Sequence, residues 1–287
     1  MAELPAPKLN EGIGGHWYTA DGQPAYEVSK ADGTGLRPTT LRDAKKLGLL
    51  PSVTTILGIL DKPQLTLWKI KTAVRVSAAV ARTDGEDEDA WVERVLAKAG
   101  EPVAEAADLG SRIHDAIEMV CRGETWDSAT LGAYVAPVIG WLVGKLGKGG
   151  RIVAQESIIV NAAYGFAGRV DCVIDMPDGT IWVVDWKSRK TRASETNERA
   201  FAPYDTHRLQ LAAYAAEWAL NQGPGKPGRG WAKVHCANVM TSSTEPGRFA
   251  VAEHADPESA WEAFKATLAL WRWIKGYDPR NGGRSQP

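Results

Sequence analysis

Apolar residues recur along the chain at two spacings, one typical of helices and the other of strands. Helical spacing predicts helices over residues 41–47, 53–60, 64–82, 90–99, 101–121, 130–146, 198–222 and 257–275. Alternating or continuous apolar runs predict strands over residues 151–160, 168–176, 180–188, 231–240 and 248–253, after an N-terminal hairpin over residues 16–28. This order indicates an α/β protein with a mixed central sheet flanked by helices and a mainly helical N-terminal region.

Two details of this pattern concern the first helices. Ser52 stands directly before the helix predicted over residues 53–60 and is a good N-cap residue. In the helix predicted over residues 64–82, Leu67, Ile70 and Val74 lie on one side, followed by Ser77 or Ala78. This spacing predicts a buried stripe along that helix.

The stretch from Gly165 to Lys190 has the clearest pattern. Two runs rich in β-branched and aromatic residues are separated by Pro177-Asp178-Gly179, which is a turn signal. Side chains alternate faces along a strand, so Asp185 and Lys187 share one face at the end of an apolar run. The pattern predicts a β-hairpin whose second arm is a buried strand that ends in a charged pair.

A carboxylate near a core needs a partner or a metal ion. The hairpin brings Asp171 from the first arm towards Asp185, and two close carboxylates repel unless a cation lies between them. Mg²⁺ and Mn²⁺ accept such oxygen ligands readily. The alternative is a surface pair of Asp185 and Lys187 beside an unrelated aspartate, and a single D-x-K triplet does not decide between the two.

Three further features accompany this triplet. Glu156 lies among Ile and Val residues of the preceding strand, where a free acid is unusual. Gln210 and Tyr214 share one face of a later helix because residues four apart lie on the same side. On an earlier helix, His114 follows Gly110 by four residues and shares one face of the helix with Glu118, four residues later. A lone histidine is more often a hydrogen-bonded structural residue than a metal ligand.

This ordered set resembles the PD-(D/E)XK nuclease superfamily. Its RecB-like branch, which includes phage exonucleases and the mitochondrial genome maintenance exonuclease, is the most similar over about residues 50–220. The resemblance implies a restriction-endonuclease-like core. Iron–sulfur members of the branch carry four cysteines, whereas this chain has three, so we expect no iron–sulfur cluster.

The resemblance also implies the roles of individual residues. The predicted catalytic residues are Glu156, Asp171, Asp185, Lys187, Gln210 and Tyr214. The predicted ligands of Mg²⁺ or Mn²⁺ are His114, Asp171, Asp185 and the carbonyl of Trp186. A metal held there lowers the pKa of a water molecule and polarises the phosphate, while the Lys187 ammonium neutralises developing charge.

A local cationic cluster adjoins these acids. The predicted nucleic-acid contacts are Arg169, Ser188, Arg189, Lys190, Arg192 and Arg208. The alternative is a solvated surface loop, which is what most charge runs are. Trp17, Trp68 and Trp186 are candidates for stacking on an unpaired base.

Composition bounds the remaining possibilities. The 287 residues, 44% hydrophobic and 24% charged, are typical of a soluble globular protein without a membrane partner. The net charge of −1 gives no global attraction to a polyanion, so any nucleic-acid site is local. Scattered cysteines, no signal-peptide pattern and no apolar run near membrane-spanning length predict a cytoplasmic protein, and we expect it in the cytosol of a bacterial host.

Three segments are expected along the chain. Residues 1–100 form an N-terminal hairpin and helical arch, residues 101–277 form the nuclease core, and residues 278–287 form a disordered tail. The leading hypothesis is a metal-dependent exonuclease on single-stranded DNA or DNA ends, used in phage or bacterial repair or recombination with an unknown partner protein. The alternatives are a structure-specific endonuclease with the same chemistry and a non-catalytic DNA-binding module.

Overall fold

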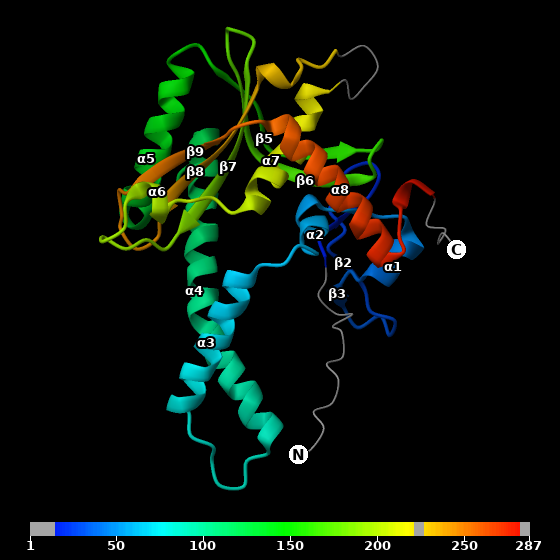
Figure 1. Ribbon diagram of the computed structural model, residues 1–287, viewed down its shortest axis with the longest axis vertical. Helices are drawn as coiled ribbons and strands as arrows, with labels where there is room; N and C mark the ends of the chain where they lie inside the picture. Colours follow the sequence, from blue (N-terminus) through cyan, green and yellow to red (C-terminus); the bar gives the residue numbers. More distant parts are fainter. Residues whose placement is uncertain (1–14, 221–226, 282–287) are drawn as a thin grey trace.

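A five-stranded sheet forms the centre of the protein, shown in Figure 1 as a computed structural model that describes residues 15–220 and 227–281. Its strands lie side by side in chain order: β5 (Arg151–Asn161), β6 (Phe166–Asp175), β7 (Ile181–Arg189), β8 (Val234–Ser242) and β9 (Phe249–His254). Only the β7–β8 pair is parallel. The predicted mixed α/β sheet, including the hairpin of β6 and β7, is therefore confirmed.

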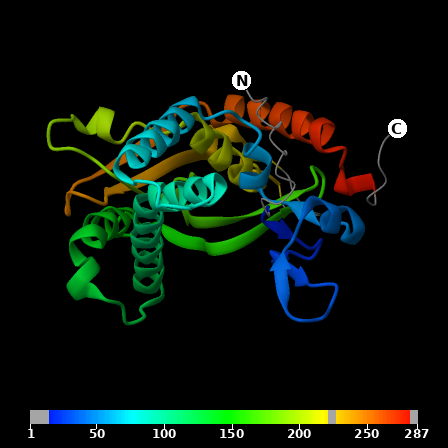
Figure 2. The same cartoon turned by 90° about the horizontal axis from the view of Figure 1, so that it is seen from below.

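Helices cover both faces of this sheet, as Figure 2 shows from below. One face packs against α2 (Val53–Leu57), α7 (Asp205–Ala219) and α8 (Pro257–Lys275). The other face packs against α4 (Glu88–Arg122) and α5 (Ser128–Leu146). Each layer buries its own apolar cluster against the sheet, and burial of this kind is the main source of stability.

Helix α5 is long and apolar enough to cross a membrane by length and composition, contrary to the expectation from the sequence. Its inner side buries Leu131, Val135, Val138 and Leu142 in the cluster shared with α4 and the sheet. The structure thus gives a packing reason for these apolar residues.

The N-terminal elements differ in part from the prediction. Short strands pair as β1 (Trp17–Tyr18) with β4 (Leu50–Pro51) and as β2 (Glu27–Ser29) with β3 (Leu36–Pro38). The hairpin predicted over residues 16–28 forms as a short antiparallel turn, in which Tyr18 bridges Pro24 and the Thr19 and Ala25 amides donate to the Gln23 and Trp17 carbonyls. A second hairpin, which was not predicted, joins β2 and β3. The helix α1 (Leu41–Leu47) is confirmed, and the Ser52 hydroxyl caps α2 by accepting from the Thr55 amide.

Helix α3 (Pro63–Ala79) and the first half of α4 project away from the sheet (Figure 1). The predicted buried stripe of α3 is wrong, because Leu67, Ile70 and Val74 are 46%, 56% and 62% exposed. The two helices predicted over residues 90–99 and 101–121 are instead the single 35-residue helix α4. This helix crosses the expected boundary at residue 100, so it contributes to both the projecting part and the sheet-covering part.

Two further predictions at the C-terminal side need correction. The helix predicted over residues 198–222 is divided into α6 (Asn197–Ala200) and α7, with Pro203 between them. A short 3₁₀ turn, η1 (Trp231–Lys233), precedes β8, and α8 is confirmed with its predicted bounds. Within the tail expected to be disordered, Pro279–Asn281 form a second 3₁₀ turn (η2), and residues 282–287 lie outside the described residues.

Gly168 sets the distance between β6 and α7. A Cβ atom at this position would lie 2.6 Å from Cε1 of the Tyr214 ring, which is buried. We expect Gly168→Ala to lower the free energy of unfolding by about 1–3 kcal/mol, because a rigid buried ring must move. Urea denaturation measures the change.

Gly132 provides the matched control for this substitution. It lies inside α5, and no atom lies within 4 Å of the position of an added Cβ. Gly132→Ala should stabilise the helix by roughly 0.5–1 kcal/mol. Equal effects of the two substitutions would contradict the role of Gly168 in close packing.

Candidate metal centre

A gap between β6 and β7 forms the base of the candidate site. The β6–β7 ladder pairs residues only as far as Cys172 with Val184. Beyond this point the Trp186 amide donates to Oδ2 of Asp171 at 2.8 Å. The side chain of Asp171 therefore replaces a ladder partner where the two strands diverge, and this places its carboxylate between them.

Asp185 and Lys187 lie on β7 beside this gap. The Asp185 carboxylate is buried, and the Lys187 ammonium donates to its Oδ1 at 2.5 Å. The Lys187 side chain is 33% exposed, so its ammonium reaches from the buried carboxylate towards solvent. The predicted pairing on one face of β7 is thus observed.

Glu156 reaches the same place through an unusual backbone conformation. Its neighbours Gln155 and Ser157 pair with Cys172 and Val170, so Glu156 lies at the level of Asp171. Its φ of 43° is in the left-handed region, which costs a residue other than glycine about 1–3 kcal/mol. Such strain occurs mostly at functional sites.

His114 reaches the site from α4, which covers the face of the sheet opposite α7 and α8. Its Nε2 lies 3.1 Å from Oδ2 of Asp171 and 3.5 Å from Oε1 of Glu156. Gly110, one turn earlier, permits the close approach of α4 to β7, since a Cβ there would lie 2.7 Å from Oγ of Ser188. The G-x-x-x-H pattern therefore has a packing explanation.

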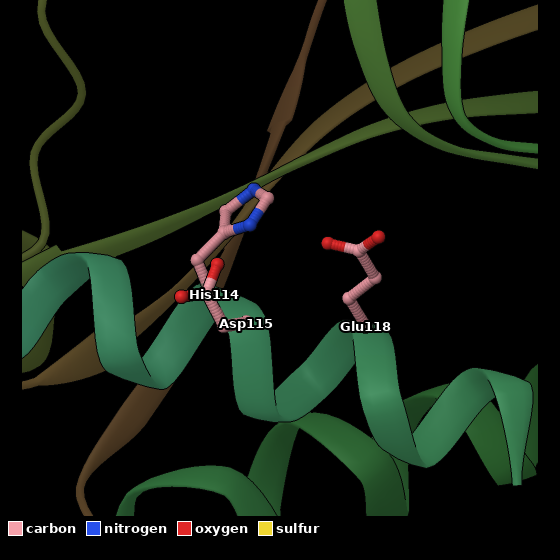
Figure 3. A group of neighbouring side chains, drawn as sticks. All are labelled: His114, Asp115 and Glu118. Atoms are coloured by element: carbon pink, nitrogen blue, oxygen red, sulfur yellow. The ribbon is translucent and has the colours of Figure 1, made fainter. Parts of the chain in front are cut away.

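The acidic neighbours of His114 on α4 appear in Figure 3. His114 and Glu118 project from the same side of the helix one turn apart, with Asp115 beside His114. The ligand atoms of these three residues lie within 4.8 Å of one another, and Glu118 also forms an ion pair with Arg122.

A second group fits a divalent cation better. The ligand atoms of His114, Glu156 and Asp171 lie within 4.8 Å of one another. Both carboxylate oxygens of Glu156 are buried without a hydrogen bond, although Arg169 Nε lies 2.9 Å from Oε2. Two carboxylates and one imidazole suit Mn²⁺ or Mg²⁺, and a cation would satisfy the Glu156 oxygens. Asp185 is not a member of this group.

The site perturbs the titration of its members. Burial raises the pKa of Glu156, and the nearby Asp171 raises it further. Burial would also raise the pKa of Asp171, but His114 and Lys187 outweigh burial, so this pKa lies below its usual value. Burial would lower the pKa of Lys187, but Asp185 and Asp171 raise it, so the side chain is an ammonium at neutral pH.

Burial raises the pKa of Asp185 from 3.8 to about 6, against the attraction of Lys187. A carboxyl with a raised pKa in the folded state loses stability as the pH rises from its unfolded to its folded pKa. Without metal, we therefore expect Asp185→Asn to gain stability relative to the wild type between pH 4 and 7, on the order of 2–3 kcal/mol. Denaturation in the presence of a chelator measures this, and a difference that does not vary with pH would contradict it.

Gln210 and Tyr214 are on the predicted face of α7. The Gln210 side-chain amide donates to the Tyr214 hydroxyl at 3.4 Å, and burial raises the pKa of Tyr214. His207 is seven residues before Tyr214 on the same helix, and burial lowers its pKa to about 4. His207, Asn238 and His254 are polar residues at the site that the sequence interpretation missed. Asn238 could have been found from the sequence, because it is a polar residue within the otherwise apolar run of β8.

The predicted nucleic-acid contacts have different environments. Arg169, Lys190, Arg192 and Arg208 are exposed, and Arg169 contacts Glu156. The guanidinium of Arg189 lies 5.0 Å from the ring centroid of Tyr204 and donates to the Ala202 carbonyl. Ser188 faces Gly110. The six nucleic-acid contacts stay predictions.

The prediction that tryptophans stack on bases is wrong for two of the three candidates. Trp17 and Trp186 are 2% and 5% exposed and belong to the two apolar clusters that cover the sheet. Trp186 also packs against Trp141. Trp68 is 43% exposed on α3 and stays a candidate.

Comparisons with known proteins place this site in a family. Residues 125–281, more than half of the chain, match the PD-(D/E)XK nuclease superfamily. No curated protein matches the chain. A solved structure titled "Crystal structure of SSO0001" is 14% identical with a TM-score of 0.29, covering 72% of this chain and 86% of that chain. The superfamily match includes β5 to β8 and hence the acids and the lysine of the site. The chain belongs to the PD-(D/E)XK nuclease superfamily.

Proposed function

We propose that this protein is a divalent-metal-dependent deoxyribonuclease of the RecB-like branch that acts on single strands or DNA ends. The superfamily acts on nucleic acid and typically uses a divalent metal. The observation that carries the proposal is the convergence of His114, Glu156 and Asp171 around one point, with Asp185 and Lys187 beside it. The RecB-like assignment is supported by His114 on α4 and by Gln210 and Tyr214 on α7.

His114, Glu156 and Asp171 would hold the cation, and the neighbouring Asp185 carboxylate would contribute a further oxygen ligand. When bound, the cation supplies a water of lowered pKa and polarises the phosphate. Lys187 is protonated at neutral pH, so its role is to neutralise charge on the phosphate oxygens rather than to remove a proton. Tyr214 is buried and retains its proton, so it contributes a hydroxyl rather than a base.

The projecting hairpin of α3 and α4 supports a single-stranded substrate. No residue of α3 is buried, and Trp68 is exposed on it together with Leu65 and Ile70. Lys69, Lys71 and Arg75 lie on the same helix. Exposed aromatic rings next to cationic side chains are typical of surfaces that bind unpaired bases and phosphates.

An assay with two substrates tests the proposal. Linear end-labelled single-stranded DNA and a circular single strand of the same length are incubated with the protein and Mn²⁺. We expect release of nucleotides from the linear strand, no cleavage of the circle, and no activity above background in Asp185→Ala. Cleavage of the circle, which has no end, would show that the protein is an endonuclease rather than an exonuclease. Salt-dependent binding without cleavage of either strand would indicate a non-catalytic binding module.

A further inference from the structure

A line of buried polar side chains crosses β7, β8 and β9 next to the candidate site. Asp185, Asn238 and His254 are 1%, 1% and 5% exposed. The Asn238 amide Nδ2 donates to Oδ2 of Asp185 at 2.6 Å. Oδ1 of Asn238 lies 2.6 Å from Nε2 of His254. Each of three neighbouring strands therefore contributes one member of a continuous chain of hydrogen bonds.

The chemistry of the three groups fixes the direction of this chain. An ionised carboxylate only accepts, so Asn238 must present its NH₂ group to Asp185 and its carbonyl oxygen to His254. His254 then donates from Nε2, which requires the neutral tautomer with the proton on that nitrogen. Burial lowers the pKa of His254 to about 4, in agreement with a neutral ring.

In this arrangement each oxygen of the Asp185 carboxylate accepts a hydrogen bond from a different side chain. Asn238 holds Oδ2, while Oδ1 faces Lys187 at 2.5 Å. Two directional bonds on opposite sides fix the plane of the carboxylate, and they compensate part of the cost of its burial. The parallel register of β7 and β8, which pairs Asp185 with Asn238, places the amide next to the carboxylate.

We propose that Asn238 is a positioning residue for Asp185, and that His254 acts in turn by fixing the side chain of Asn238. This rests on the proposed function, in which Asp185 contributes to the metal centre. Groups that orient metal-binding side chains affect metal affinity by about tenfold to a hundredfold. A purely structural pair would change the stability of the fold and leave the metal affinity unchanged.

Titration calorimetry of the 287-residue chain with Mn²⁺, without DNA, tests the proposal. Asn238→Leu keeps the volume but removes the donor, and it should weaken Mn²⁺ binding by about tenfold to a hundredfold. His254→Leu should weaken binding less, because it removes only the group that orients Asn238. His254→Gln, which can still donate, should restore binding close to the wild-type value.

Thr241→Val is the matched control. Thr241 is a buried polar residue of the same strand, and its hydroxyl donates to the Tyr134 carbonyl rather than to Asp185. Its removal should lower the free energy of unfolding without changing Mn²⁺ affinity. Denaturation curves of all variants separate the two effects.

Two results would overturn the proposal in distinguishable ways. Wild-type Mn²⁺ affinity in Asn238→Leu would assign Asn238 a structural role alone, while leaving the proposed nuclease function intact. No Mn²⁺ uptake by the wild-type protein would remove the proposed function and this inference with it. Should Asn238→Leu fail to fold, equal affinities of His254→Leu and the wild type would overturn the chain of hydrogen bonds as a positioning device.

Discussion

Replacing Glu156 by glycine should abolish nuclease activity and Mn²⁺ binding and yet stabilise the metal-free protein. The φ of 43° costs glutamate about 1–3 kcal/mol, whereas glycine adopts it freely. The substitution also removes a buried carboxylate that lacks a hydrogen bond. We expect the free energy of unfolding to rise by about 1–2 kcal/mol, which denaturation in the presence of a chelator measures.

Asp256→Gly is the matched control for Glu156→Gly. Asp256 is the other described residue besides glycine with a positive φ, 52°, and it is the N-cap of α8. Replacing an N-cap by glycine costs only a few tenths of a kcal/mol, so relief of strain should dominate. Asp256→Gly should therefore also stabilise the protein while keeping activity. A loss of stability in Glu156→Gly would refute the view that strain is retained at this position for metal binding.

Lys187→Met should lower the rate of DNA cleavage by about 10²–10³-fold without weakening Mn²⁺ binding. The ammonium is a cation, so its removal takes away charge stabilisation at the phosphate but no metal ligand. The substitution also removes the positive charge beside Asp185 and Asp171, and with it the repulsion between that charge and an incoming metal ion. Single-turnover cleavage and Mn²⁺ calorimetry on the same variant measure both quantities.

Lys190→Met separates this role from general attraction of DNA. Lys190 is exposed in the loop that follows β7. Its removal should weaken DNA binding and reduce the salt dependence of binding, while the cleavage rate at saturating DNA stays unchanged. Similar rate losses in both lysine variants would mean that Lys187 contributes no specific charge stabilisation.

Local signals in the sequence were sufficient for the hairpin that carries the site. The turn at Pro177-Asp178-Gly179 and the apolar runs on both sides determine β6, β7 and the position of Asp185 and Lys187. The bounds of α8 were predictable for the same reason, since Asp256 caps one end and Gly276 the other. Both elements depend on residues close together in the chain.

Features that depend on distant contacts could not be predicted in this way. The periodicity of α3 indicated a buried stripe, but α3 packs against α4 away from the sheet and the stripe stays exposed. Pro102 resembled the start of a helix, because proline is favoured in the first turn, yet α4 begins at Glu88. The contact of Asn238 with Asp185 depends on the parallel register of β7 and β8, which are connected through α7.

The continuity of α4 limits how this enzyme can be re-engineered. One helix of 35 residues begins at Glu88 in the projecting hairpin, carries His114 about 39 Å further along, and ends at Arg122. A chimaera that takes its hairpin from another nuclease must therefore splice within a helix, in phase with its turns. An insertion of one or two residues before Gly110 would rotate the donor hairpin by about 100° or 200° relative to the catalytic centre, because each residue advances a helix by 100°.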